Sequence, residues 1–190
     1  MSYNIKYMSK TNVRNYTNKE ILDKVKLEPN FKGFPNKLWN VAIRSSEDAN
    51  DKFDDKIYTF NGEVFISISS CTTNKGNKGT AVMCTGLFYD SFEYGLHKQK
   101  TPALRQIKAV PYRRDYTNDK KTNPSTIVYN DIIYTNIHAA SHDLNQQIVK
   151  TNIGGYSEGC IVLNDIPYYK EWIKKFKLIG LVTFCLLDEF

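Results

Sequence analysis

Two stretches near the C-terminus decide how this chain folds and acts: residues 132–138, IIYTNIH, and residues 156–163, YSEGCIVL. The first is rich in β-branched and aromatic residues, which is typical of a strand, and it ends on His138. The second places Gly159 directly before Cys160 and an apolar run directly after it. A strand-end imidazole and a thiol behind a glycine are residue types that suit nucleophilic catalysis by cysteine.

A cysteine nucleophile needs a base that takes its proton and backbone N–H groups that stabilise the oxyanion on the attacked carbonyl. We predict that His138 is the base and that the N–H groups around Gly159 and Cys160 are the donors. Gly159 has no side chain, so substrate can approach and the chain can turn sharply. Ser157 adds a polar group and is counted with the catalytic residues. The predicted substrate-binding residues are His97, Tyr156 and Glu158, and the alternative for His97 is that it caps a turn.

Two helices are predicted, one early and one late. Residues 17–20, TNKE, match a capping box that starts a short helix over 18–27. Asn164 or Asp165 is expected to cap a helix over 166–178. The chain between these helices has the pattern of strands.

A hairpin is predicted at Asn61-Gly62, where both turn residues favour positive φ. The stretch 115–126, rich in Asp, Asn and Lys, is predicted to be a surface loop. The fold class is therefore mostly β, with a short N-terminal helix and one late helix. The predicted strands cover residues 38–43, 57–60, 64–68, 80–88, 103–112, 132–138 and 181–187.

Composition limits the partners. The chain has 190 residues, 41% hydrophobic and 24% charged, which is typical of one globular domain. A net charge of +6 attracts acidic partners such as an anionic cell wall, although solubility alone explains it equally well. Nucleic-acid binding is not expected, because the basic residues occur singly or in short pairs. The N-terminus has no apolar secretory signal, and no membrane span is predicted.

The cysteines lie far apart, without a CxxC pair or metal-ligand spacing, so free thiols are expected and neither a metal nor another cofactor is predicted. Cys71, Cys84 and Cys185 lie in apolar strand patterns and are predicted to be structural. His142 is a rival base, which we expect to be solvated in its polar loop.

The order of Ile137-His138, a loop and residues 157–163 resembles the signature of the L,D-transpeptidase catalytic domain family. In that family a strand-end His is followed, after a variable loop, by Ser, a variable residue, Gly and Cys. The resemblance is closest to a branch seen in phages and Bacteroidetes-like bacteria. It covers residues 34–190, implies a β-sandwich-like catalytic fold, and leaves 1–33 as an N-terminal leader with a short helix. The further segments that carry it are 41–46, 54–56, 95–98 and 102–104.

The resemblance implies a cysteine peptidase or transpeptidase, a hydrolase or a transferase, that acts on peptidoglycan stem peptides. Cys160 would attack a peptide carbonyl and form a thioester, which water or an amine then resolves. A carbonyl or a polar side chain near residues 139–157 would orient the imidazole, with Ser141 and Ser157 as the two side-chain alternatives. Without a signal peptide, the expected protein is phage-encoded and lytic or virion-borne. It would be present in the host cytoplasm or in the virion, beside other virion proteins, and would act at the cell wall.

Three residues depart from the pattern of many family members. Ala139 replaces a Gly, Glu158 replaces a His or Lys, and Val162 replaces an Arg that would help to bind a substrate carboxylate. A Glu beside the nucleophile also disfavours the thiolate unless it points away. These departures support an alternative, a catalytically degenerate member that serves as a virion structural or wall-binding component.

Overall fold

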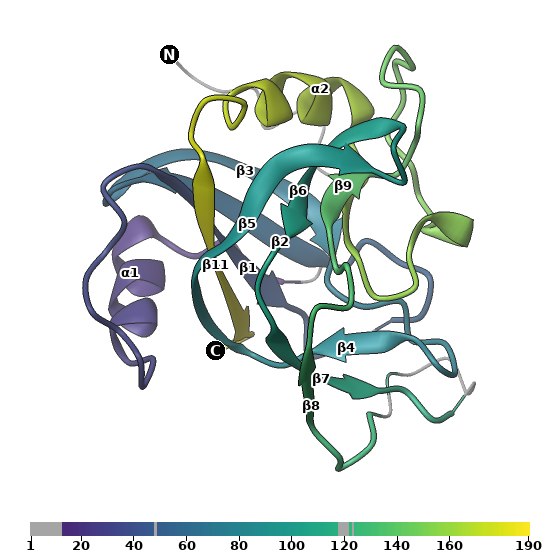
Figure 1. Cartoon of the computed structure of the whole chain (residues 1–190), viewed down its shortest axis with the longest axis horizontal. Coiled ribbons are helices and arrows are strands. Elements are labelled where there is room, and N and C mark those ends of the chain that lie inside the picture. Colours follow the sequence, from purple (N-terminus) through teal and green to yellow (C-terminus); the bar gives the residue numbers. More distant parts are fainter. Residues whose placement is uncertain (1–12, 48, 118–121, 123) are drawn as a thin grey trace.

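The computed structural model describes residues 13–47, 49–117, 122 and 124–190, and most of them form β-structure (Figure 1). Eight strands close into a barrel in the order β1-β11-β5-β6-β9-β10-β3-β2, and a separate three-stranded sheet has the order β4-β7-β8. The helices are α1 (Asn18–Lys26) and α2 (Ile166–Lys174), with a 3-10 turn over Gly154–Tyr156. The strands are β1 (Leu38–Arg44), β2 (Asp55–Asn61), β3 (Val64–Thr72), β4 (Ala81–Met83), β5 (Gly86–His97), β6 (Thr101–Gln106), β7 (Val110–Arg114), β8 (Tyr129–Asp131), β9 (Ile137–Ala139), β10 (Ile161–Leu163) and β11 (Leu181–Asp188).

The mostly-β class with an early and a late helix is confirmed, but the β-sandwich expectation is wrong. Strand β1 pairs antiparallel with β2 on one side and parallel with β11 on the other, so the last strand joins the first. Val41 lies opposite Tyr58 in β2 and opposite Cys185 in β11. This parallel pairing closes the sheet, whereas a sandwich would keep two separate sheets with open edges.

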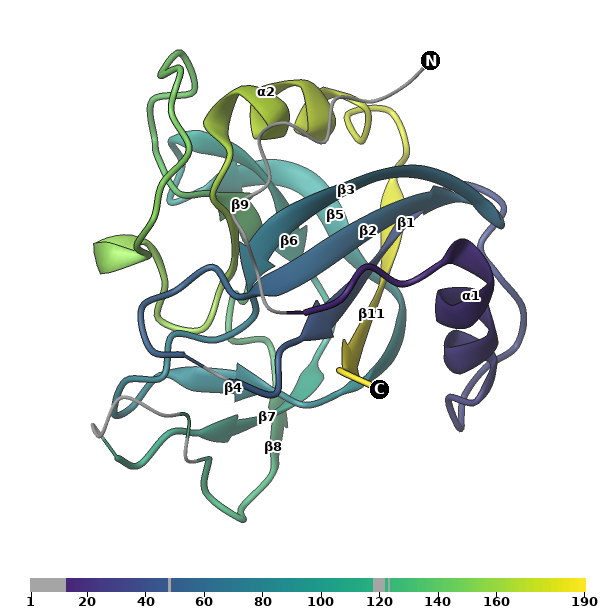
Figure 2. The ribbon, with the colours of Figure 1, turned by 180° about the vertical axis from the view of Figure 1, so that it is seen from behind.

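The wall of the barrel is buried on both faces at β1. Trp39, Val41 and Ile43 belong to one buried cluster, which they share with α1, whereas Ala42 belongs to the second cluster, inside the barrel. Successive side chains of a strand point to opposite faces, so both faces must be covered. Helix α1 supplies the outer cover on this side (Figure 2).

Helix α1 begins with the predicted capping box at Thr17. The Thr17 N–H donates to the Glu20 carboxylate at 2.7 Å, and the Glu20 N–H donates to the Thr17 hydroxyl at 3.3 Å. Just before the helix, the Tyr16 hydroxyl donates to the carbonyl of Phe190 at 2.7 Å. Residues 13–26 are thus packed on the barrel, while 1–12, the start of the predicted leader, lie outside the described residues.

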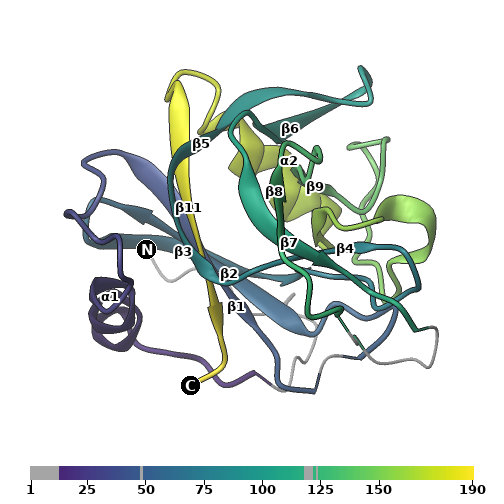
Figure 3. The ribbon, with the colours of Figure 1, turned by 60° about the horizontal axis from the view of Figure 1, so that its bottom comes forward.

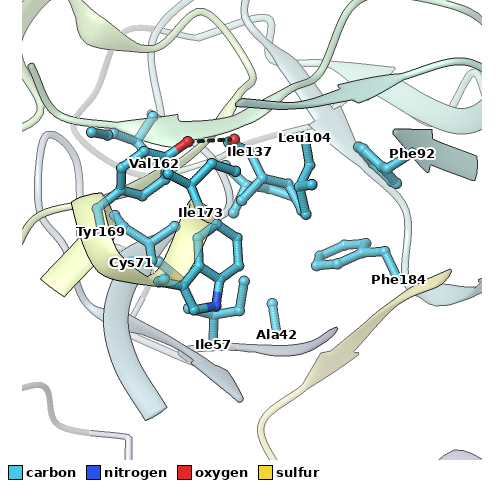
Figure 4. Close-up of a cluster of buried hydrophobic side chains, with 14 of the residues drawn as sticks. Ala42, Ile57, Cys71, Phe92, Leu104, Ile137, Val162, Tyr169, Ile173 and Phe184 are labelled. Carbon is cyan, nitrogen blue, oxygen red and sulfur yellow. Dashed lines mark hydrogen bonds between the residues drawn. The ribbon is translucent and has the colours of Figure 1, made fainter. Parts of the chain in front are cut away.

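Helix α2 lies across one end of the barrel, at the top of Figures 1 and 2. Asp165, one of the two predicted caps, accepts the N–H of Tyr168 at 2.9 Å. The Tyr169 hydroxyl contacts the carbonyl oxygen of Pro102 at 2.7 Å. It also contacts that of Ile137 at 3.3 Å (Figure 4). The helix is shorter than predicted and ends at Lys174, after which the chain continues in turns.

Two predicted strands are each divided between the barrel and the small sheet. Residues 80–88 contain β4 and the start of β5, and residues 103–112 contain the end of β6 and the start of β7. Each part contains buried residues, and the chain changes sheet at short exposed stretches that include Thr85 and Lys108. Figure 3 brings the small sheet, β4-β7-β8, to the front.

Two more details differ from the sequence-based expectation. The hairpin turn is Gly62-Glu63 rather than Asn61-Gly62, with Asn61 still paired to Val64, and only Gly62 of these residues has a positive φ. Of the predicted strand 132–138, only Ile137 and His138 lie in β9, and residues 132–136 are irregular. Within the predicted loop 115–126, residues 118–121 and 123 lie outside the described residues.

Neither helix of the described residues has the length and hydropathy that crossing a bilayer requires.

The packing of α1 predicts that it unfolds together with the barrel. Ile21 is fully buried, so Ile21→Ala should lower the free energy of unfolding by about 2–5 kcal/mol in a single urea transition. Leu27 follows the helix and is 75% exposed, so it provides the matched control. Leu27→Ala should change the free energy of unfolding by less than about 0.5 kcal/mol. Equal, small effects would mean that the segment is not part of the cooperative fold.

Candidate active site

Parallel pairing of β9 with β10 brings the two stretches that suggest catalysis together. Ile161 lies opposite Ile137, and Val162 lies opposite His138. The N–H of Ile161 donates to the carbonyl of Asn136 at 2.9 Å, which places Cys160 at the same end of the strand pair as Asn136. One side-chain nitrogen or sulfur atom from each of His97, His138 and Cys160 lies within 4.8 Å of the other two.

The His138 ring is buried and held in one tautomer. Its Nδ1 lies 2.8 Å from the carbonyl oxygen of Ala139, so Nδ1 carries the proton and Nε2 keeps its lone pair. Nε2 is buried and has no hydrogen-bond partner among the described residues. Burial, and after it the neighbouring His97, lowers the pKa of His138 to about 3. The ring is therefore neutral at pH 7 and offers an unused acceptor.

Two serines, Ser141 and Ser157, were proposed to orient the His138 ring. Among the described residues, neither forms a hydrogen bond with it. The Ser141 hydroxyl donates to the carbonyl of Asp143 at 3.1 Å, and the Ser157 hydroxyl donates to the carbonyl of Cys160 at 2.9 Å. The backbone carbonyl of Ala139 takes this role instead, which was the other alternative.

The Cys160 thiol is partly buried and donates to the carbonyl oxygen of Tyr134 at 3.5 Å. Burial raises the pKa of Cys160 to about 11, and Glu158 adds to this; the backbone N–H of Asn136 and the charge of Lys98 oppose it. The resting pair is thus a neutral thiol beside a neutral imidazole. Attack would require His138 to take the proton as the new bond to sulfur forms.

The turn before Cys160 is closed by hydrogen bonds. Ser157 accepts the N–H of Gly159 at 3.1 Å and donates to the carbonyl of Cys160. The hydroxyl of Thr135 donates to the carbonyl of Gly159, and the N–H of Ala81 donates to the carbonyl of Glu158 at 3.2 Å. The Gly159 N–H is therefore already used, so the predicted oxyanion donors reduce to the N–H of Cys160, for which the described residues offer no acceptor.

A groove of about 1030 Å³ opens over Cys160. The three predicted substrate-binding residues, His97, Tyr156 and Glu158, all contribute to its wall, whereas His138 is buried and is not part of the wall. Glu158 is the single acidic residue in the described wall. The basic residues of the wall are Lys75, Lys78, Lys98, Arg105 and Arg114.

The rival base, His142, lies outside the groove wall. It is exposed, and its Nδ1 lies 2.8 Å from the hydroxyl of Thr101. Its ring centroid is 6.1 Å from that of His97, so it borders the histidine pair.

The sequence interpretation missed Asn136 and Lys98. Asn136 sits two residues before His138, and its side chain contacts His97 Nδ1 at 3.1 Å. Asn is depleted in strands, so an Asn within an otherwise β-branched run was a signal that could have been used. Lys98 stands at a hairpin tip, where it and Gln99 both have positive φ, and nothing in the local pattern points to the groove.

His97, His138 and Cys160 are residue types that bind metals, and they lie close together, although no metal was predicted. His138 Nε2 and the sulfur could act as ligands. His97 Nδ1 already accepts a hydrogen bond from the amide of Asn136, which places the proton of the neutral ring on Nε2. The set therefore offers a metal two ready ligand atoms rather than three.

No family model, curated protein or solved structure matches the chain. The resemblance to the L,D-transpeptidases therefore stays an inference from the His138 and Cys160 motifs.

Gly159 cannot carry a side chain without displacing Ala81. Its φ is +127°, and a Cβ there would lie 2.8 Å from both the Cβ and the carbonyl oxygen of Ala81. Gly159→Ala should lower the free energy of unfolding by about 1–3 kcal/mol through backbone strain alone. Gly155→Ala is the matched control, because its Cβ would meet nothing within 4 Å at an ordinary φ. Urea titration measures both, and an unaffected Gly159→Ala would contradict the described turn.

The raised pKa predicts how the Cys160 thiol titrates. Below its pKa the thiolate fraction falls about tenfold for each pH unit, so alkylation of Cys160 by iodoacetamide should be slow at pH 7 and still rising at pH 10. Mass spectrometry of the Cys160 peptide gives the rate, with the Cys84 peptide as an internal reference. A plateau below pH 8 would instead indicate a thiolate–imidazolium pair.

Proposed function

We propose that this chain is a cysteine-dependent acyl-transfer enzyme that acts on peptidoglycan stem peptides, as a peptidase or an L,D-transpeptidase. One observation carries the proposal: His138, whose buried Nε2 has no hydrogen-bond partner among the described residues, has a ring nitrogen within 4.8 Å of the sulfur of Cys160, a residue that lines an open groove. An unpaired buried polar atom is costly, so its retention beside a nucleophile favours a catalytic role.

The reaction would proceed in two halves. His138 Nε2 takes the proton of Cys160 while the sulfur bonds to the peptide carbonyl carbon, and the carbonyl oxygen gains the electron pair. The tetrahedral species collapses to a thioester when the amine leaves with the proton from His138. Water or an acceptor amine then attacks the thioester, His138 takes its proton, and that proton returns to the departing sulfur.

The basic wall of the groove supports a substrate that carries carboxylates. Val162, which replaces the Arg of many L,D-transpeptidases, is fully buried in the core and cannot contact substrate. Lys98 and Arg105 line the groove and are the groups we propose for carboxylate binding in its place. Lys98 lies near enough to lower the pKa of Cys160, His97 and His138.

The setting we propose follows from the resemblance to the phage and Bacteroidetes-like branch. On that reading the enzyme is phage-encoded and lytic or virion-borne, and it acts on the host wall together with other virion proteins. The net charge of +6 is compatible with an anionic wall.

A second function is favoured by the titration of the site. A thiol with a pKa of about 11 next to an imidazole with a pKa of about 3 is a poor resting nucleophile. A degenerate member, kept as a virion structural or wall-binding component, would retain the groove and its basic residues without turnover.

Muropeptides distinguish the two functions. Native protein should convert them to hydrolysed or cross-linked products detectable by mass spectrometry, and Cys160→Ala should remove this activity because no nucleophile remains. His138→Ala should lower the rate by about 10²–10⁴-fold through loss of the base.

Cys84→Ala is the matched control, since Cys84 is also a partly buried free thiol but lies outside the groove wall. It should retain full activity. Binding of muropeptides without products, equal in native protein and Cys160→Ala, would contradict the enzyme and support the degenerate member.

A further inference from the structure

We propose that His97 is a catalytic hydrogen-bond donor, which stabilises the oxyanion through Nε2–H, and that Asn136 is the positioning residue that holds it in this tautomer. The inference rests on the proposed acyl-transfer function and assigns to His97 a role beyond substrate contact.

The tautomer of His97 is fixed by a chain of two hydrogen bonds that starts at the backbone N–H of Gln106. The N–H of Gln106 donates to Asn136 Oδ1 at 3.0 Å, so the other end of this amide is the NH₂ group. Asn136 Nδ2 lies 3.1 Å from His97 Nδ1. Because an NH₂ group can only donate, Nδ1 must accept, and the proton of the neutral ring sits on Nε2.

Gln106 also holds Asn136 in place, because its side chain forms hydrogen bonds to the backbone of residues 131–135, which precede Asn136. The buried Gln106 side chain accepts the N–H groups of Ile133 at 3.1 Å and Thr135 at 3.0 Å. Its own NH₂ group donates to the carbonyls of Lys108 at 2.9 Å and Asp131 at 3.0 Å. One side chain thus fixes the path of the backbone that carries Asn136.

The two stacked histidines therefore have opposite tautomers. The rings of His97 and His138 lie 4.0 Å apart at 18°. His138 has its proton on Nδ1 and a free lone pair on Nε2, while His97 has its proton on Nε2. Burial and the charge of Lys98 lower the pKa of His97 to about 4, so it is neutral at pH 7. One ring can take a proton and the other can donate a hydrogen bond.

The positions of the rings match these roles. His138 is buried and outside the groove wall, whereas His97 forms part of that wall at the end of β5. His97 Nε2 has no hydrogen-bond partner in the described part of the chain, so its N–H is available to substrate. Since the N–H of Gly159 is used by Ser157, the Cys160 N–H alone would be a single donor, and His97 supplies the second.

During attack, the sulfur–carbon bond forms and the carbonyl π pair moves to oxygen, where the N–H groups of His97 and Cys160 stabilise the negative charge. The thiol proton goes to His138, and His97 keeps its own proton throughout. The oxyanion collapses as the carbon–nitrogen bond breaks and the amine leaves with the proton from His138.

Two reactions of Cys160 separate an oxyanion donor from a structural residue. Acylation by p-nitrophenyl acetate forms an oxyanion, whereas alkylation by iodoacetamide does not. His97→Ala should lower the rate of Cys160 acylation by about 10²-fold or more while changing its alkylation by less than about threefold. His97→Gln, which keeps an N–H donor, should restore acylation to within about tenfold of native. Equal losses in both reactions would contradict the donor role.

The tautomer is measured independently of activity. Long-range ¹H–¹⁵N correlation spectra of the full-length protein at pH 7 should show His97 protonated at Nε2 and His138 protonated at Nδ1. In Asn136→Asp, which keeps the acceptor for the Gln106 N–H, the neutral His97 ring at pH 9 should move its proton to Nδ1. The added carboxylate should slow both reactions of the thiol to the same extent, so the ratio of acylation to alkylation should fall by a factor similar to that of His97→Ala.

The outcomes separate the two proposals. A native His97 protonated at Nδ1 would overturn the donor assignment even if Cys160 turns over muropeptides. Native Cys160 that reacts with neither reagent would refute the enzyme, whatever tautomer the spectra show. An unchanged ratio of acylation to alkylation in Asn136→Asp, with the proton moved to Nδ1, would overturn the positioning role.

Discussion

The parallel pairing of β9 with β10 is the contact on which the rest of the site depends. It joins segments separated by a long loop, sets Val162 opposite His138, and leaves Cys160 and Asn136 just before the paired residues. A slip of one residue would turn every side chain of the short strand to the other face. The core prevents this, because Ile137 and Val162 are fully buried beneath α2, whose Tyr169 hydroxyl contacts the carbonyl oxygen of Ile137 (Figure 4).

The site combines burial with hydrogen bonds that hold each neutral group in one state. Burial favours the neutral forms of Cys160, His97 and His138. No ion pair among these three side chains therefore fixes their orientation. Hydrogen bonds from backbone groups set the tautomers of the two histidines instead. The Ala139 carbonyl sets the proton of His138, and the Gln106 N–H, through Asn136, sets the proton of His97. The result is an acceptor and a donor beside one sulfur, which is the arrangement that acyl transfer uses.

Local patterns predicted the features that are decided locally. The capping box at Thr17 and the Asp165 cap follow from side-chain chemistry within one turn, and both are present. Pairing between distant strands leaves no trace in a local pattern, so the closure of the barrel through β1 and β11 was not predicted and the sandwich was wrong. The division of residues 80–88 between two sheets was missed for a related reason, because only two residues, Cys84 and Thr85, separate β4 from β5.

The sequence indicated the candidate residues His138 and Cys160, but it did not indicate how the side chains of the site pack against and orient one another. The motif around Cys160 and the predicted strand-end position of His138 suggested the pair. The fold places them in proximity, although His138 is the middle residue of β9 rather than its last. The stacking of His97 on His138 requires the β5-β6 hairpin to lie beside β9, with Leu104 of β6 opposite Ile137, and no spacing in the sequence reveals this pairing. The orienting group of His138 is a backbone carbonyl, and backbone atoms carry no sequence signal.

The central claim is that the sulfur of Cys160 accepts an acyl group from a peptide. The most direct measurement is the mass of the intact protein after rapid acid quenching during reaction with a stem peptide, followed by peptide mapping. We expect one acyl group on Cys160, released by hydroxylamine as a thioester should be. An unmodified Cys160 throughout turnover, or an acyl group found on Cys84 instead, would contradict it.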